Sequence, residues 1–172
     1  MLLVNLYGGP GVGKSTAAAF IFSQLKMKGV NVELVTEFAK DKVWEDTKEV
    51  FNNQAYIFGK QYFRISRCAE KVDVIVTDSP LLLSIIYNDS ELLGEEFNAV
   101  VRKVAKSFNT KNYFLIRNFD YETVGRRHNE EESNEIQRQI YDLLNKEQIS
   151  YHIDLSNIST YNAIVEDILL SL

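Results

Sequence analysis

The clearest chemical signal in the chain is a glycine-rich run near its start. Residues 8–16 read Gly-Gly-Pro-Gly-Val-Gly-Lys-Ser-Thr. Four of them satisfy the phosphate-binding pattern G-x-x-x-x-G-K-[ST]: Gly8, Gly13, Lys14 and Ser15. Glycines let the backbone approach phosphate oxygens closely and adopt the dihedral angles that this wrapping needs. The predicted nucleotide-binding residues are Gly8, Gly9, Pro10, Gly11, Val12, Gly13, Lys14, Ser15 and Thr16.

Two residues of this loop have predicted roles at the phosphates. Lys14 is expected to contact the β and γ phosphates of a nucleoside triphosphate, and the Ser15 hydroxyl to ligate Mg²⁺. The amino terminus of the helix that follows offers free N–H donors and a positive dipole to the same anion. ATP and Mg²⁺ are therefore the predicted cofactors, with GTP left open as an alternative phosphoryl donor.

Two acids follow predicted strands and are candidates for catalysis. Asp78 comes directly after the largely apolar residues 74–77, which is typical of a carboxylate at a strand tip that faces the metal. It could also cap a helix that begins at Pro80. Glu37 follows the strand before it and could take a proton from an acceptor hydroxyl. Asp41 is the reserve candidate for that base, and a solvated loop carboxylate is the alternative interpretation.

Arginines mark a second loop that could close over the nucleotide. Arg117 ends a predicted strand and is a candidate nucleotide contact, and Arg126 and Arg127 follow Gly125 in the segment 118–130. Arginines on a mobile loop can neutralise the charge that develops in phosphoryl transfer. We therefore predict that this segment is a lid, with Arg126 and Arg127 as its catalytic residues.

A long predicted helix at residues 49–71 carries two separate stripes. Basic residues recur at helical spacing along one face: Lys60, Arg64, Arg67 and Lys71. Such a stripe is usually the solvated side of a helix. Gln54 and Gln61 are seven residues apart among aromatic residues, which suits a nucleobase that is hydrogen-bonded and stacked, although core packing explains the aromatic residues equally well. The predicted acceptor-binding residues are Glu37, Gln54, Gln61 and Arg64.

The elements that must position these residues alternate between strands and helices. The hydrophobic pattern predicts strands at residues 2–7, 31–36, 72–77, 112–116 and 150–155. Helices are predicted at residues 15–28, 49–71, 95–108, 133–146 and 160–170, and a helix or turn at residues 81–87. This alternation implies an α/β fold with a parallel sheet covered by helices on both faces. Ligands of such sheets lie beyond the carboxyl ends of the strands, where the loop, Glu37 and Asp78 are predicted.

Composition excludes several classes of protein. The chain has 172 residues, a net charge of −5 and a single cysteine, Cys68, so a disulfide framework and a cysteine zinc cluster are excluded. We interpret residues 1–172 as one domain in a reducing, cytoplasmic setting. The start of the chain does not resemble a signal peptide, and no stretch is apolar enough for a membrane span. The acidic balance disfavours non-specific binding of duplex DNA.

The chain resembles the small P-loop kinases of the nucleoside and nucleotide kinase group. It is most similar to short kinase-like ATPases encoded by bacteriophages and to the nicotinamide riboside kinase domain. The similar segments are residues 8–16, 35–40, 53–67, 74–87 and 125–135. The resemblance implies a three-layer P-loop NTPase fold with strand order 2-3-1-4-5, and a host-cytoplasmic location if the protein is phage-encoded.

The same resemblance implies residue roles. Glu37 would be the base, Gln54 would read a nucleobase, and Arg126 and Arg127 would belong to the lid. One departure concerns the residue after the third-strand acid, which is arginine in deoxynucleoside kinases and Ser79 here. Recognition of the acceptor is where this chain departs from that group.

Three functions fit these residues. The leading one is transfer of the γ-phosphoryl group of ATP to a small nucleoside- or nucleotide-like acceptor. The second is a nucleotide-dependent ATPase or switch, against which 172 residues leave no room for the additional helical domain of AAA-type oligomeric ATPases. The third is a kinase acting on hydroxymethylated bases in phage DNA, the one function with a nucleic-acid partner. The basic stripe would then contact the DNA electrostatically. No membrane partner is expected, and a homodimer is compatible with the sequence.

Overall fold

A five-stranded parallel sheet forms the centre of the molecule. The computed structural model describes residues 1–39, 53–89, 91–122 and 129–172. The strands are β1 (Leu2–Tyr7), β2 (Val32–Val35), β3 (Val74–Thr77), β4 (Thr110–Ile116) and β5 (His152–Leu155). They lie in the order β2-β3-β1-β4-β5, and every neighbouring pair is parallel. The predicted fold class and strand order are confirmed.

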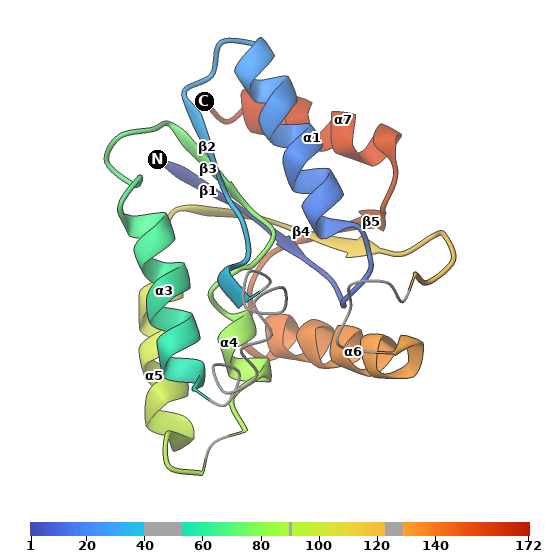
Figure 1. Cartoon of the computed structure of the whole chain (residues 1–172). Coiled ribbons are helices and arrows are strands. Elements are labelled where there is room, and N and C mark those ends of the chain that lie inside the picture. The colour runs from blue at the N-terminus through green and yellow to red at the C-terminus, as the bar shows by residue number, and fades with distance from the viewer. Residues whose placement is uncertain (40–52, 90, 123–128) are drawn as a thin grey trace.

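Helices cover both faces of this sheet (Figure 1). On one face lie α1 (Lys14–Met27) and α7 (Ile158–Leu169). On the other lie α3 (Gln54–Ser66), α4 (Leu83–Ile86), α5 (Gly94–Ala105) and α6 (Glu130–Lys146). Successive side chains of a strand point to opposite faces, so every residue of β1 is buried, by one helical layer or the other. Because β1 is packed between both helical layers, the position at which the following loop starts is fixed.

Most predicted elements are present, and the helix starts differ for a local reason. Helix α6 begins three residues before the predicted start because Asn129 and Glu132 form a reciprocal capping box. Helix α7 begins two residues early because the Asn157 side chain accepts a hydrogen bond from the Thr160 N–H at 2.9 Å. Capping residues therefore set boundaries that apolar spacing alone did not give.

Strand alternation also places polar groups inside the molecule. Asn5 on β1 and Asn112 on β4 are opposite in register and hydrogen-bond through their side chains at 2.9 Å. Both are buried on the face that α3 to α6 cover, as is Tyr7. Among the residues the structure describes, no helix has both the length and the apolar character of a membrane span.

Candidate nucleotide site

The glycine-rich loop, residues 8–13, connects β1 to α1 at the carboxyl edge of the sheet, and we call it the phosphate loop. Three glycines there have positive φ angles: Gly8 at 137°, Gly11 at 80° and Gly13 at 89°. A Cβ atom at Gly8 would lie 2.7 Å from the carbonyl oxygen of Leu115, and one at Gly13 would lie 2.7 Å from Ser156 Oγ. Both the dihedral angles and the lack of space therefore require glycine at these positions.

The first turn of α1 forms the functional end of this loop. Lys14 Nζ donates hydrogen bonds to the carbonyl oxygens of Gly8 and Gly9, at 2.7 and 2.9 Å, so its ammonium group lies across the loop. Ser15 and Thr16 are exposed at the helix start. No acidic residue occupies the first turn of α1, so nothing within that turn offsets its positive dipole. This arrangement suits an anion with several oxygens, such as a polyphosphate.

Helix α6 holds the outer side of the loop. The Ser133 hydroxyl donates to the carbonyl oxygen of Pro10 at 2.5 Å, and Gln137 Oε1 accepts from the Gly9 N–H at 3.2 Å. Ser133 and Gln137 are one helical turn apart, so one face of α6 makes both contacts. Sequence reasoning missed this support, because residues more than a hundred positions away in the chain supply it.

The two candidate acids meet at the neighbouring strand ends. Asp78 follows β3 directly and is only 5% exposed, and its Oδ1 atom accepts a hydrogen bond from the Glu37 N–H at 2.9 Å. Glu37 is half-buried. Because β3 pairs with β1, with Thr77 beside Asn5, Asp78 lies at the edge of the sheet from which the phosphate loop also starts. The structure thus brings together the acids that the sequence singled out separately.

The donor set at this edge fits Mg²⁺. The Ser15 hydroxyl and the Asp78 carboxylate are hard oxygen ligands, which Mg²⁺ prefers. Among the described residues there is no group of three His, Cys, Asp or Glu side chains that could hold a metal ion alone. Mg²⁺ is ordinarily held by one or two protein oxygens together with water and substrate phosphates, so this sparse set is the expected one.

Gln61, on α3, supports the acid edge, by which we mean the strand ends that carry Glu37 and Asp78. Its side chain is buried, Oε1 accepts from the Phe38 N–H at 3.0 Å, and Nε2 lies 3.4 Å from Thr77 Oγ1. The Thr77 hydroxyl oxygen also accepts from the Ser79 N–H at 3.1 Å. Gln61 therefore ties the residue that follows Glu37 and the residue that precedes Asp78 to one helix. These contacts give Gln61 a positioning role, and its contact with substrate stays a prediction.

The other candidate acceptor residues lie on the same helix. Gln54 is buried at the first turn of α3, after the capping residue Asn53. Arg64 donates to the carbonyl oxygen of Thr36 at 3.2 Å, and its guanidinium group lies 5.2 Å from the centre of the Phe38 ring. Arg64 therefore turns toward the segment that follows β2 and carries Glu37, while Lys60, Arg67 and Lys71 are exposed.

Arg117 lies just beyond the end of β4. It donates to Glu130 Oε1 at 2.5 Å, and its guanidinium group lies 4.9 Å from the centre of the Tyr121 ring. Its Nη1 atom is buried and has no hydrogen-bond partner within the described ranges. The predicted lid arginines, Arg126 and Arg127, lie outside the described residues, as does the reserve base Asp41. Their roles stay predictions.

An aromatic residue near the loop was not singled out by the sequence analysis. Phe119 is 48% exposed, and its Cζ atom is 3.5 Å from where a Gly13 Cβ would lie. On the same side, Ser156 and Tyr161 share a hydrogen bond of 2.6 Å between their hydroxyl oxygens. An isolated phenylalanine in a polar loop has no distinctive sequence pattern, so only the fold reveals its position.

The sheet order and the phosphate loop define a P-loop nucleotide-binding protein. A family model described as an AAA domain matches residues 3–159, and the chain belongs to that family. A search of curated proteins found no match. Membership supports nucleotide binding by an ATPase-like or kinase-like protein.

Proposed function

We propose that this protein transfers the γ-phosphoryl group of ATP to a hydroxyl or phosphate of a small nucleoside- or nucleotide-like acceptor. The observation that carries the proposal is the hydrogen bond between the Glu37 N–H and Asp78 Oδ1 at 2.9 Å. It holds two acids at adjacent strand ends, next to the phosphate loop. One carboxylate can serve the metal while the other serves an acceptor, a division that suits phosphoryl transfer to a hydroxyl.

The residues of this chain would act mainly by positioning and by neutralising charge. The acceptor oxygen forms a bond to the γ phosphorus, the bond from that phosphorus to the β–γ bridging oxygen breaks, and ADP leaves. Glu37 takes the acceptor proton. Lys14 and the N–H groups at the start of α1 stabilise the negative charge on the phosphate oxygens. Mg²⁺, when bound to Ser15 and Asp78, supplies further positive charge at those oxygens.

The donor base is expected beside Phe119. This half-exposed ring lies next to Gly13 at the start of α1, on the side away from Glu37. A planar base can stack on an aromatic ring with little dependence on its hydrogen-bonding pattern. Stacking on Phe119 alone would discriminate little between adenine and guanine, so GTP is a further donor to test.

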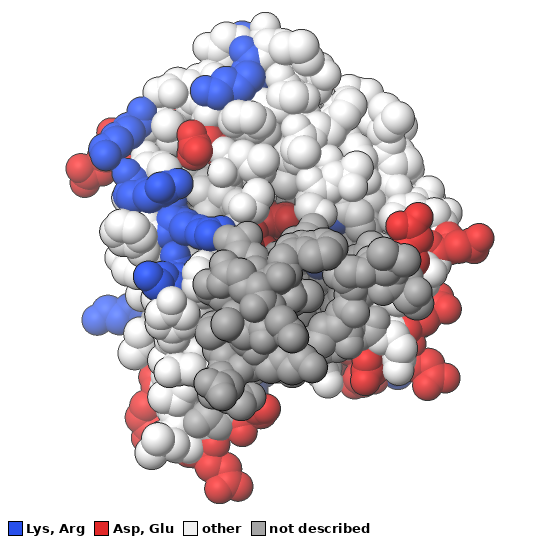
Figure 2. Space-filling view, in the orientation of Figure 1, with Lys and Arg blue, Asp and Glu red and all other residues white. Residues whose placement is uncertain are grey.

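The AAA family favours a second candidate, an ATPase or switch that needs no small acceptor. In that case water takes the place of the acceptor, and Glu37 would orient water. The third candidate, a kinase on modified DNA bases, is supported by the exposed basic side chains along α3. Figure 2 shows Lys and Arg gathered on the α3 side and Asp and Glu around α6.

One assay separates these functions. ADP release is measured with ATP and Mg²⁺ alone, and then with nucleosides, nucleoside monophosphates, nicotinamide riboside and hydroxymethylated DNA. Stimulation by a small acceptor, with the phosphorylated product found by mass spectrometry, supports the proposal. ADP release that no acceptor changes supports the ATPase, and stimulation by the DNA that falls with salt supports the third candidate.

Lys14→Ala is the control for this assay. Lys14 is the first residue of α1, at the edge of the sheet, so we expect the variant to fold and to lose ADP release under every condition. Circular dichroism and the thermal midpoint check the fold. Normal turnover by a folded Lys14→Ala protein would contradict all three functions.

A further inference from the structure

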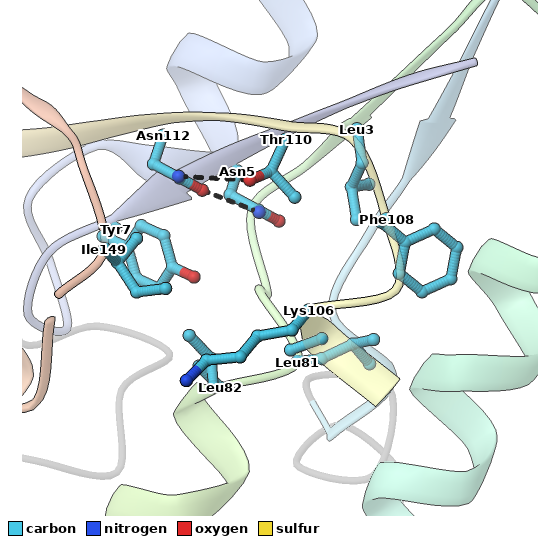
Figure 3. Close-up of a pocket in the computed structure, with 11 residues that line it drawn as sticks. Leu3, Asn5, Tyr7, Leu81, Leu82, Lys106, Phe108, Thr110, Asn112 and Ile149 are labelled. Atoms are coloured by element: carbon cyan, nitrogen blue, oxygen red, sulfur yellow. Dashed lines mark hydrogen bonds between the residues drawn. The ribbon is translucent and has the colours of Figure 1, made fainter. Parts of the chain in front are cut away.

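A cavity of about 200 Å³ lies beneath β1 and β4, on the face that α4, α5 and α6 cover (Figure 3). Its walls are largely apolar and include Leu3, Leu82 and Ile149. Lys106, at the end of α5, lies at its rim and is paired with Glu147 at 3.1 Å. The cavity lies on the β1 segment that precedes the phosphate loop and is lined by none of the loop residues, so it is a separate feature of the molecule.

One wall of the cavity carries a buried acceptor without a partner. The Asn112 amide nitrogen donates to the carbonyl oxygen of Ser150 at 3.0 Å, so its oxygen faces Asn5. That oxygen accepts from Asn5 Nδ2 at 2.9 Å, which fixes the orientation of the Asn5 amide as well. Asn5 is 5% exposed, and its Oδ1 atom has no hydrogen-bond partner in the part of the chain that the structure describes.

Figure 3 shows the Asn5 oxygen turned away from Asn112 at the cavity wall. A buried polar atom is ordinarily satisfied by protein, water or ligand, because leaving it unpaired is costly. Tyr7 contributes a second polar group, its hydroxyl, to the same space. Burial raises the pKa of Tyr7, so this hydroxyl keeps its proton at neutral pH.

We propose that this cavity binds a flat, mostly apolar molecule of one or two rings that donates one N–H hydrogen bond to Asn5 Oδ1. The size supports this class, because an apolar cavity of about 150 Å³ accommodates benzene. A space of about 200 Å³ suits a bicyclic ring. The apolar walls provide most of the affinity, and the unpaired Asn5 acceptor gives the orientation.

A matched pair of probes tests the proposal on the full chain. Indole carries one N–H donor, and 1-benzothiophene has nearly the same shape without it. Binding is followed by ¹H–¹⁵N NMR, with the Asn5 side-chain amide as the reporter. We expect saturable binding of indole, with 1-benzothiophene weaker by about tenfold or more because the buried acceptor then stays unpaired. Equal affinity of the two probes, or no saturable binding of indole, overturns the proposal.

A cavity-filling variant locates the site. Ala105 lines the cavity at the end of α5, whereas Ala99 is exposed on the same helix. Ala105→Leu is expected to abolish indole binding, and Ala99→Leu to leave it unchanged. Asn5→Leu is the more direct change, but it also removes the partner of Asn112, so the alanine pair is the safer test. Unchanged indole binding by a folded Ala105→Leu protein overturns the proposal, and none of these readouts depends on phosphoryl transfer.

Discussion

The phosphate loop and the acid edge lie side by side, yet different forces shape them. The loop gets its form mainly from its own residues, with three glycines at positive φ and the Lys14 side chain folded across its carbonyl oxygens, while α6 adds two contacts. The acid edge gets its form from side chains that come from other elements. Glu37 is held through Asp78, and Phe38 through Gln61. The loop should therefore fail through backbone changes, and the acid edge through the loss of single side-chain contacts.

Gly13→Ala should have the largest effect, because it tests the backbone side of this comparison. The alanine would have a backbone φ near 89°, and its Cβ would lie 2.7 Å from Ser156 Oγ. The left-handed conformation costs about 1–2 kcal/mol and the crowding about 1–3 kcal/mol more. We expect the thermal midpoint to fall and nucleotide binding to be lost, as measured by calorimetry with ATP and Mg²⁺.

Gly29→Ala is the matched control for this change. Gly29 has a φ of 81°, but nothing lies within 4 Å of an added Cβ. Only the conformational cost of about 1–2 kcal/mol remains. ATP should bind this variant normally. Equal loss of ATP binding in both variants would show that the loop does not depend on the close approach described above.

Glu37→Gln tests whether the acid edge performs chemistry. The substitution preserves the Glu37 backbone N–H, which donates to Asp78 Oδ1, so the edge should keep its form. If Glu37 is the base, kcat should fall by about 10²–10⁴-fold, with a smaller effect on ATP binding. Both kcat and the KM for ATP are measured by steady-state kinetics, with the acceptor that the ADP-release assay identifies. An unchanged kcat would move the role to Asp78 or Asp41.

The same contrast explains what the sequence could reveal. The loop and the strand order could be predicted, because glycine spacing and strand–helix alternation are local patterns. Glu37 and Asp78 could be found because each lies at the end of a strand with apolar residues, Asp78 directly after β3 and Glu37 two residues after β2. The support from Gln61, Ser133 and Gln137 could not be found, since their partners are backbone groups of distant segments, and a backbone group has no side-chain pattern in a sequence.

Gln61→Met tests the side-chain support of the acid edge. The change keeps the volume but leaves the buried Phe38 N–H without its acceptor, which costs about 1–3 kcal/mol. We expect a lower free energy of unfolding, measured in urea, and a lower kcat, because the segment that carries Glu37 is no longer held. Gln139→Met, at an exposed position of α6, is the control and should change neither quantity. If Gln61→Met raised only the KM for the acceptor, Gln61 would contact substrate directly, as the sequence suggested.

Gln137→Met should have the smallest effect, and it tests whether the loop also needs side-chain support. It removes the acceptor of the Gly9 N–H, a bond of 3.2 Å at a half-buried position. A hydrogen bond of this kind contributes about 0.5–1.5 kcal/mol, which corresponds to at most about a tenfold change in an equilibrium constant. The conformation of the loop depends mainly on its own residues. The Gln137 contact should therefore influence how well the loop is positioned for ATP rather than the chemical step. We therefore expect the KM for ATP to rise a few-fold, on the order of that limit, with kcat nearly unchanged. Gln139→Met, two residues along the same helix, should leave the KM unchanged. A fall in kcat as large as that of Glu37→Gln would mean that α6 shapes the loop during catalysis, and that the two regions depend on side-chain contacts alike.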